Sequence, residues 1–184
     1  MTSFKAAVLT VSDRVSRGEA EDRSGDLLAE LLQADGFTVA RRVVPDERDQ
    51  IAAALRELAG EARLVLTTGG TGLGPRDVTP EATSEVIERE APGIAQALRA
   101  DSIAKTPHGL LSRGAAGTVG ATLVVNLPGS PGGSRDGFAV LRPALAHAIE
   151  LLEECRPHVN GAYIVPSFGR YEVAGELVTA AKRR

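Results

Sequence analysis

Four short apolar runs are spread along the chain, and each is long enough for a buried β-strand. They occupy residues 6–11, 37–44, 64–66 and 121–127. The first run is apolar without alternation, which is typical of a strand covered on both faces of a parallel sheet, whereas Arg41 and Arg42 break the apolar pattern of the second run near its end. Because segments with helical spacing separate the four runs, the pattern predicts an α/β fold of three layers: a mostly parallel sheet with helices on both faces and right-handed crossovers.

The segments between the predicted strands contain helix signals. Ser24 is a candidate cap for a helix with a leucine stripe that stops at Gly36. Thr79 and Pro80 have the order of an N-cap and a first helical residue, and this helix is expected to continue to Glu90. The other expected segments are a mobile loop at 15–23 and helices at 51–58, 94–103 and 136–155.

The length of 184 residues fits one ordinary domain with a tail. The predicted strands and helices all fall within residues 1–155. From Arg156 onward the composition shifts, with five basic and two acidic residues and half of the aromatic side chains. We therefore expect a domain at 1–155 and a C-terminal extension at 156–184, in which residues 159–165 are a candidate short strand.

Polar side chains follow the apolar runs where the predicted strands end. Ser12 and Asp13 follow the first run, Asp46 follows the second, and a proline–glycine turn at 128–133 follows the fourth. The carboxyl ends of parallel strands lie along one edge of a sheet, where α/β folds bind ligands, so we expect these residues to gather there. Asp46 has two compatible interpretations, as a functional carboxylate or as the cap of the next helix.

A loop rich in glycine follows the third run, with Gly69, Gly70, Gly72 and Gly74. Glycines let backbone N–H groups approach a phosphate, and a nearby helix start adds positive potential. The loop is neither a P-loop, since no Gly-Lys-Ser/Thr follows, nor a dinucleotide fingerprint, since the spacing differs. Its exit carries Arg76 beside Asp77, a cation and a carboxylate suited to a phosphate and a metal ion. The competing interpretation is a flexible surface loop.

Composition argues against several classes of function. The net charge of −3 and the small number of aromatic residues, two tyrosines and four phenylalanines, leave no basic groove or stacking surface for nucleic acid. No apolar run is long enough to span a membrane, and the first residues do not have the layout of a signal peptide. A single cysteine, Cys155, excludes an internal disulfide, which fits a cytoplasmic protein. His108, His147 and the Cys155/His158 pair give poor support for a metal site.

Four motifs carry a family resemblance. The longest runs from Thr67 to Glu81 and reads TTGGTGLGPRDVTPE, and the others are TVSD at 10–13, Ser112-Arg113, and LPGSP at 127–131. Together they resemble the molybdopterin adenylyltransferase family of the Mog/MoaB type, which also includes the gephyrin G domain. The resemblance covers roughly residues 4–155 and implies the Mog/MoaB-like α/β fold for the domain.

The resemblance implies a function in molybdenum cofactor biosynthesis: the Mg²⁺- and ATP-dependent adenylylation of molybdopterin, with release of pyrophosphate. It implies that Asp46 and Asp77 are catalytic and hold Mg²⁺. It also implies a homo-trimer and a partner that inserts molybdate. The residues that it implies for nucleotide or pterin binding are Ser12, Asp13, Thr68, Gly69, Gly70, Thr71, Gly72, Arg76, Ser112, Pro128, Gly129, Ser130 and Pro131.

Two other classes of function are compatible with the same residues. One is a non-catalytic molybdopterin-binding or scaffold protein of the same fold, and the other is a nucleotide-handling hydrolase on a related domain. Because a phosphate nucleophile is already ionised at neutral pH, adenylyl transfer does not require a strong base in the sequence. ATP consumption that depends on molybdopterin separates this reaction from both alternatives.

Overall fold

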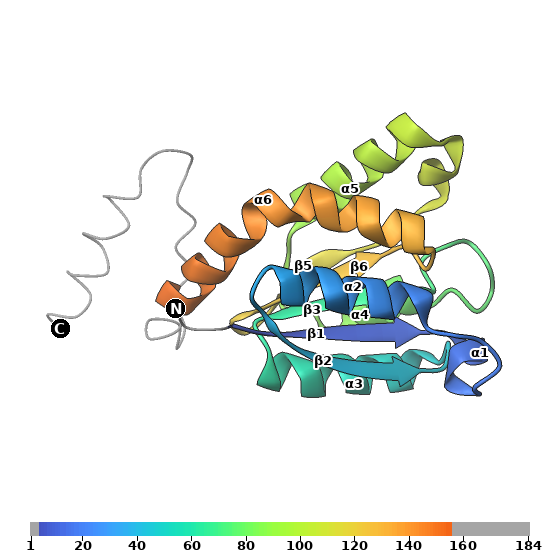
Figure 1. Cartoon of the computed structure of the whole chain (residues 1–184), viewed down its shortest axis with the longest axis horizontal. Coiled ribbons are helices and arrows are strands. Elements are labelled where there is room, and N and C mark those ends of the chain that lie inside the picture. Colours follow the sequence, from blue (N-terminus) through green and yellow to red (C-terminus); the bar gives the residue numbers. More distant parts are fainter. Residues whose placement is uncertain (1–3, 156–184) are drawn as a thin grey trace, which may run out of the picture.

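Six strands form one sheet, in the order β2-β1-β3-β6-β5-β4 (Figure 1). The structure is a computed structural model, and it describes residues 4–155. The extension at 156–184, with its candidate strand, lies outside the described residues. The strands are β1 (Lys5–Val11), β2 (Thr38–Val44), β3 (Leu64–Thr68), β4 (Arg89–Glu90), β5 (Ala116–Val119) and β6 (Thr122–Leu127).

The four predicted strands are the parallel part of this sheet, which confirms the predicted fold class. In the register, Val11 pairs with Val44 and Thr10 with Thr68, and Thr68 pairs in turn with Leu127, so the four carboxyl ends are level. Strands β5 and β4 add an antiparallel edge that the apolar pattern did not predict. Because these four strands end side by side, the residues that follow them lie at one edge of the sheet.

Helices cover both faces of the sheet, as predicted. Alternate residues of β1 point to opposite sides: Ala6 and Val8 belong to one core, and Ala7 and Leu9 to the other. Helices α2 (Arg23–Ala34) and α6 (Pro131–Cys155) pack on the first core, while α3 (Arg48–Glu61) and α4 (Thr79–Val86) pack on the second. Helix α5 (Pro92–Lys105) and the 3₁₀ helix η1 (Pro107–Leu111) project beyond α6 (Figure 1).

Two predicted helix caps are wrong. The N-cap of α2 is Asp22, whose carboxylate accepts a hydrogen bond from Gly25 N at 3.0 Å, and Ser24 is buried in the first turn. The N-cap of α4 is Val78, because the Thr79 hydroxyl donates to the Gly69 carbonyl at 2.9 Å instead of capping its own helix. Both side chains that were predicted as caps are therefore used in tertiary packing.

Three segment boundaries also differ from the prediction. The expected mobile loop at 15–23 begins with a short helix, α1 (Asp13–Ser16), which Ser12 caps. The helix expected to reach Glu90 ends at Val86, because Arg89 and Glu90 pair with β5. The expected turn at 128–133 is shorter, because Pro131 already begins α6.

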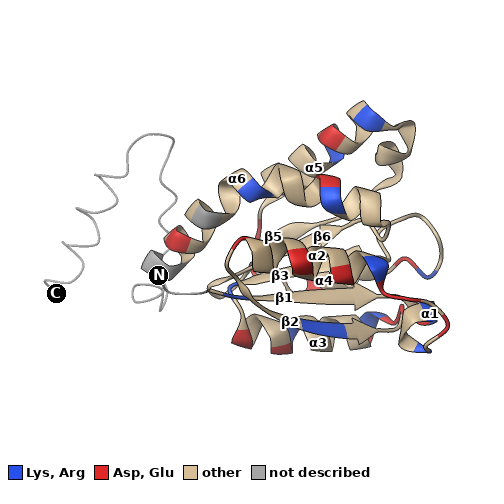
Figure 2. Ribbon diagram, viewed as in Figure 1, with Lys and Arg blue, Asp and Glu red and all other residues tan. Residues whose placement is uncertain are grey.

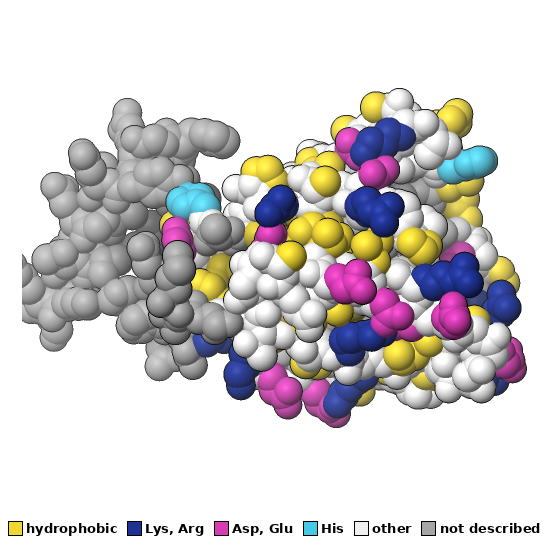
Figure 3. Space-filling view, viewed as in Figure 1, with side chains coloured by type: hydrophobic (Ala, Val, Ile, Leu, Met, Phe, Trp, Pro, Cys, Tyr) yellow, Lys and Arg dark blue, Asp and Glu magenta, His cyan; other side chains and the backbone are white. Residues whose placement is uncertain are grey.

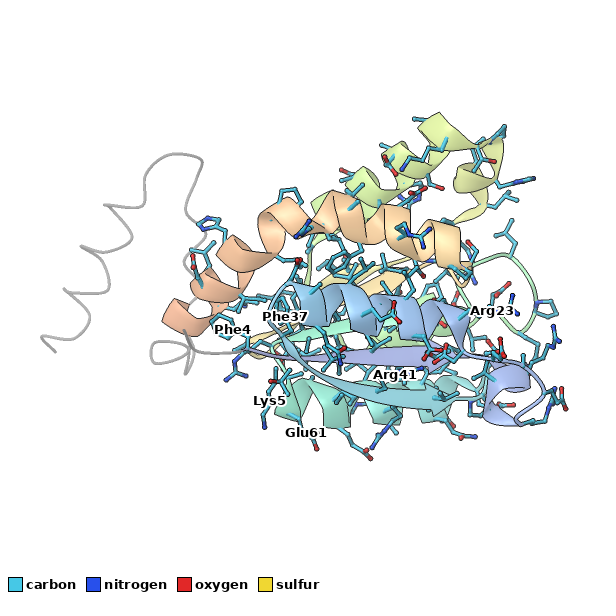
Figure 4. The ribbon with its side chains drawn as sticks, viewed as in Figure 1. Phe4, Lys5, Arg23, Phe37, Arg41 and Glu61 are labelled. Atoms are coloured by element: carbon cyan, nitrogen blue, oxygen red, sulfur yellow. The ribbon has the colours of Figure 1, made fainter. Side chains whose placement is uncertain are left out.

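The two ends of the strands differ in character. Phe4 and Phe37 pack against the core at the amino ends of β1 and β2 (Figure 4). Acidic and basic positions occur together around α1 at the carboxyl ends (Figure 2). In the space-filling view, basic and acidic side chains are interspersed over the visible face, without a continuous basic surface (Figure 3). Within residues 4–155, none of the helices is long and apolar enough to cross a membrane.

Candidate active site

The ends of β1 and β2 are joined through Asp13 and Asp46. The backbone N–H of Asp13 donates to Oδ2 of Asp46 at 2.7 Å, and the backbone N–H of Asp46 donates to Oδ1 of Asp13 at 3.1 Å. The cap of the following helix α3 is Glu47, with no side-chain hydrogen bond, so Asp46 is not that cap. The cap interpretation of Asp46 is therefore wrong, and its interpretation as a functional carboxylate stays a prediction.

Arg76 reaches from the glycine loop to this pair of strand ends. Its guanidinium contacts both carboxylate oxygens of Asp13, with Nη2–Oδ1 and Nη2–Oδ2 distances of 3.0 Å, and it contacts Glu47 Oε1 at 2.8 Å. The hydrogen bonds from Arg76 lower the pKa of Asp13, and both carboxylates raise the pKa of Arg76. The cation that was expected to meet a phosphate is thus held by two carboxylates, of which Glu47 was not predicted.

The first half of the glycine loop is part of the packed structure. Gly69 and Gly70 have φ angles of +103° and +62°, a backbone region that favours glycine. The Thr79 hydroxyl donates to the Gly69 carbonyl, and the Thr79 N–H donates to the Gly70 carbonyl at 3.1 Å. These contacts and the burial of Gly69 are inconsistent with a freely flexible surface loop.

The second half of the loop wraps around the carboxylate of Asp77. Oδ2 of Asp77 accepts a hydrogen bond from Gly74 N at 2.8 Å, and Asp77 N donates to the Gly74 carbonyl at 3.0 Å. A Cβ at Gly72 or at Gly74 would lie 2.9 Å or 2.8 Å from the same Oδ2. The glycines therefore allow the backbone to enclose this carboxylate.

Asp46 lies within the electrostatic influence of two other carboxylates. Burial raises the pKa of Asp46, and repulsion from Asp13 and Asp77 adds to this, against a hydrogen bond from the Asp13 backbone and attraction to Arg76. Oδ1 of Asp46 faces the loop, since it lies 3.3 Å from the position of a Cβ on Gly70. The strand ends thus bring together acidic groups whose mutual repulsion a cation would reduce.

Two cavities flank the glycine loop. The larger, of about 500 Å³, lies between the loop, α5, η1 and the start of α6, and Lys105 and His108 are among its lining residues. The smaller, of about 400 Å³, lies over the ends of β1 and β3 and the start of α2. Each has the volume of a small-molecule site.

The predicted binding residues divide between these cavities. Those that line the larger cavity are Thr71, Gly72, Ser112, Pro128 and Ser130. Those that line the smaller cavity are Ser12, Asp46, Thr68, Gly69, Gly70, Gly129 and Pro131. Asp13, Arg76 and Asp77 line neither cavity. Asp13 contacts Asp46, which lines the smaller one, and Arg76 contacts Asp13.

Asp22 is a lining residue that the sequence did not reveal. Its carboxylate accepts hydrogen bonds from the Thr10 hydroxyl at 2.8 Å and from Arg41 at 2.7 Å, besides the cap of α2. Figure 4 shows Arg41 on β2 at this end of the sheet. Asp22 therefore fixes β1, β2 and α2 relative to one another at the smaller cavity. The sequence signal for Asp22 as a helix cap would have been an acidic residue two positions before Ser24.

Residues 7–147 match the family described as "Probable molybdopterin binding domain". The chain belongs to this family. It is 37% identical over 157 residues to the molybdopterin adenylyltransferase of Helicobacter pylori (strain J99), a match that covers 83% of this chain and 89% of the relative. The predicted family is therefore confirmed.

Two further proteins are similar to this chain over most of its length. The chain is 41% identical over 159 residues to the molybdenum cofactor synthesis protein cinnamon of Drosophila melanogaster; the match covers 83% of this chain, which spans only 26% of that relative. The structure of the molybdopterin biosynthesis Mog protein from Mycobacterium ulcerans superposes with a TM-score of 0.78 at 39% identity, covering 82% of this chain and 99% of that one. This likeness confirms the Mog/MoaB-like fold.

Magnesium is the metal that the molybdopterin-binding family resemblance implies. Among residues 4–155, no group of three His, Cys, Asp or Glu side chains could hold a metal ion by itself. Magnesium usually takes only one or two protein carboxylates and completes its shell with water and substrate phosphates. Asp46 lies next to Gly70, Asp77 lies next to Gly72 and Gly74, and the charge of Asp77 influences Asp46, so these two oxygen donors fit this requirement.

Proposed function

We propose that this chain is a molybdopterin adenylyltransferase that transfers the adenylyl group of Mg-ATP to molybdopterin and releases pyrophosphate. The observation that carries the proposal is the position of the glycine loop. It lies between two cavities of small-molecule size, with Asp46 next to Gly70 and Asp77 next to Gly72 and Gly74 of the same loop. A reaction that joins two phosphorylated substrates requires two adjacent sites that share one phosphate-binding element.

In the proposed reaction the terminal phosphate of molybdopterin attacks the α-phosphorus of ATP. A new phosphorus–oxygen bond forms as the bond between the α-phosphorus and its bridging oxygen to the β-phosphate breaks, and pyrophosphate leaves with that electron pair. Negative charge develops on the oxygens around the α-phosphorus. We assign its stabilisation to the backbone N–H groups of the loop at Gly70–Gly72, because preorganised donors act strongly where water is excluded.

Asp46 and Asp77 are the proposed ligands of Mg²⁺. When bound, the ion would neutralise charge on the phosphate oxygens of ATP and of the leaving pyrophosphate. The protein's own contribution is to hold both carboxylates ready. Asp46 is fixed by the backbone N–H of Asp13, and Asp77 by the backbone N–H of Gly74.

Arg76 is the proposed cation for the substrate phosphates. In the present arrangement its guanidinium is paired with Asp13 and Glu47, and its side chain is about half exposed, at 54%. Ion pairs of this exposure contribute little to stability and exchange partners readily. We propose that a phosphate replaces one of these carboxylates when ATP binds.

The specific alternative is a non-catalytic member of the same family that holds molybdopterin for a partner. The same cavities would serve this function, and the carboxylates at the strand ends would then be structural. The acidic groups favour catalysis, because Asp46 and Asp77 repel each other and the phosphates unless a cation lies between them.

We also retain the cytoplasmic location and the molybdate-inserting partner as predictions.

The test is to incubate the full chain with molybdopterin, Mg²⁺ and ATP and to measure pyrophosphate. We expect release only when all three are present. ATP hydrolysis without molybdopterin would support the hydrolase interpretation instead. Molybdopterin binding without pyrophosphate release would support the scaffold interpretation.

A further inference from the structure

Arg113 clamps the two ends of the loop that presents Asp77. Its Nε donates to the Gly72 carbonyl at 2.7 Å, and its Nη2 donates to the carbonyl of Asp77 itself. Its third nitrogen, Nη1, pairs with Glu81 in the first turn of α4. One guanidinium thus joins the start of the loop, its end and the helix that follows.

The clamp is itself held in place. The backbone N–H of Arg113 donates to the Thr71 carbonyl at 3.0 Å, next to the residue that its side chain contacts. On the other side, Arg99 from α5 donates to the carbonyls of Ser112 and Gly114 at 3.0 Å and 3.4 Å. The backbone on both sides of Arg113 is therefore fixed, and its side chain is only 33% exposed.

The same segment forms part of the larger cavity. Thr71, Gly72, Ser112 and Gly114 all line it, whereas Asp77 lies at the far end of the loop and lines neither cavity. Burial is the largest single influence on the pKa of Glu81 and acts to raise it. The hydrogen bond from Arg113, a backbone hydrogen bond and attraction to Arg113 and Arg48 together lower that pKa, so the Glu81–Arg113 pair is charged at neutral pH. Arg113 thus ties the far end of the loop, at Asp77, to Gly72, which lines the larger cavity.

We propose that Arg113 is a positioning residue for adenylyl transfer: its guanidinium holds the Gly72–Asp77 loop closed, so that Asp77 stands in its working position. This inference rests on the proposed function. A planar guanidinium with its donors in a fixed fork can serve two carbonyls and a carboxylate at once, which a lysine ammonium on a flexible stem does less well. The residue does not touch the reacting atoms, so its loss acts through Asp77.

The test compares Arg113→Ala and Arg113→Lys with the wild-type chain. We expect Arg113→Ala to lower kcat for pyrophosphate release by about a hundred-fold, the scale for displacing a catalytic group by roughly 1 Å. The KM values for ATP and molybdopterin should change little, and the Mg²⁺ concentration needed for half-maximal rate should rise. Arg113→Lys should retain an intermediate rate.

Arg142→Ala is the matched control, because Arg142 pairs with Asp35 on the exposed surface, away from both cavities.

Amide hydrogen exchange in the free chain provides a measurement that does not depend on turnover. The N–H groups of Gly74 and Asp77 are protected by hydrogen bonds within the loop, so Arg113→Ala should accelerate exchange at 72–77 and leave β1 and β3 unchanged. Unchanged exchange, or faster exchange with an unchanged kcat and Mg²⁺ requirement, would overturn the proposal. A wild-type chain that releases no pyrophosphate would overturn the proposed function and the catalytic role with it, while the exchange would still show whether Arg113 holds the loop.

Discussion

Substitution of Gly70 by alanine should have opposite effects on stability if the loop binds a ligand and if it is a flexible surface loop. The φ angle of Gly70 is +62°, and a Cβ there would lie 2.3 Å from the Thr79 hydroxyl oxygen. We predict that Gly70→Ala lowers the free energy of unfolding by about 1–3 kcal/mol through backbone strain. It should also weaken the binding of ATP or molybdopterin, because the loop amides move. Thermal melts without ligand and calorimetric titrations measure the two effects.

Gly36 is a control that separates the backbone strain at Gly70 from the steric clash of a Cβ with Thr79. Gly36 also has a positive φ, of +88°, but no atom lies within 4 Å of its Cβ position, and it follows α2 away from the cavities. Gly36→Ala should therefore reduce stability without changing ligand affinity. If Gly70→Ala instead raised the melting temperature and left both affinities unchanged, the loop would not be a binding element.

Asp77 can be tested with a change that preserves its shape. In Asp77→Asn the side-chain oxygen can still accept the hydrogen bond from Gly74 N, so the loop should keep its form. The charge proposed to hold Mg²⁺ is lost, and we predict a fall in pyrophosphate release of about two to three orders of magnitude. Binding of molybdopterin, followed by titration, should persist. Wild-type turnover in the variant would exclude a catalytic function for Asp77.

At the scale of elements, the long apolar strands and the loop could be predicted, and the short strands could not. The four predicted strands contain apolar runs, interrupted in β2 by Arg41 and Arg42, whereas β5 reads Ala-Gly-Thr-Val and β4 has only two residues. The two cap predictions were wrong because tertiary contacts decide how polar side chains are used: Asp22 caps α2 in place of Ser24, and Thr79 bonds to the Gly69 carbonyl. The strand-end rule predicted that Asp13 and Asp46 meet. The contacts of Glu47 and Arg113 depend on how loops fold back, which no local pattern indicates.

The ion pair between Asp13, at the end of β1, and Arg76 of the glycine loop gives the stability a small dependence on pH, because solvent screens this exposed pair. The hydrogen bond from Arg76 lowers the pKa of Asp13 below its ordinary value of 3.8. Ionised Asp13 therefore stabilises the folded chain fully above pH 3.8. This stabilisation is lost as the pH falls through the folded-state pKa of Asp13, because Asp13 takes up a proton first in the unfolded chain. We predict that the free energy of unfolding of Asp13→Asn falls less steeply than that of the wild type below about pH 4. Urea unfolding at a series of pH values tests this, and parallel curves would contradict it.

At the scale of the whole molecule, several large apolar side chains are exposed within the described part of the chain. Helix α5 has no buried residue, and Ile103, Leu110 and Leu111 on α5 and η1 are exposed. These elements project from the body of the domain (Figure 1). Clustered apolar side chains on a surface often mark a site of association or of ligand entry. The fold of one chain is thus compatible with the assembly that the sequence resemblance implies.

The predicted assembly is a homo-trimer of the full chain. With a chain mass of 19.2 kDa, light scattering should give about 58 kDa at working concentration, three times the mass of one chain. Closed cyclic symmetry is the usual solution for soluble homo-oligomers, so a single mass that is independent of moderate dilution is expected, without larger species. A mass near that of one chain would refute the trimer and would leave the exposed residues of α5 and η1 to be explained by ligand entry at the larger cavity, which Leu111 lines.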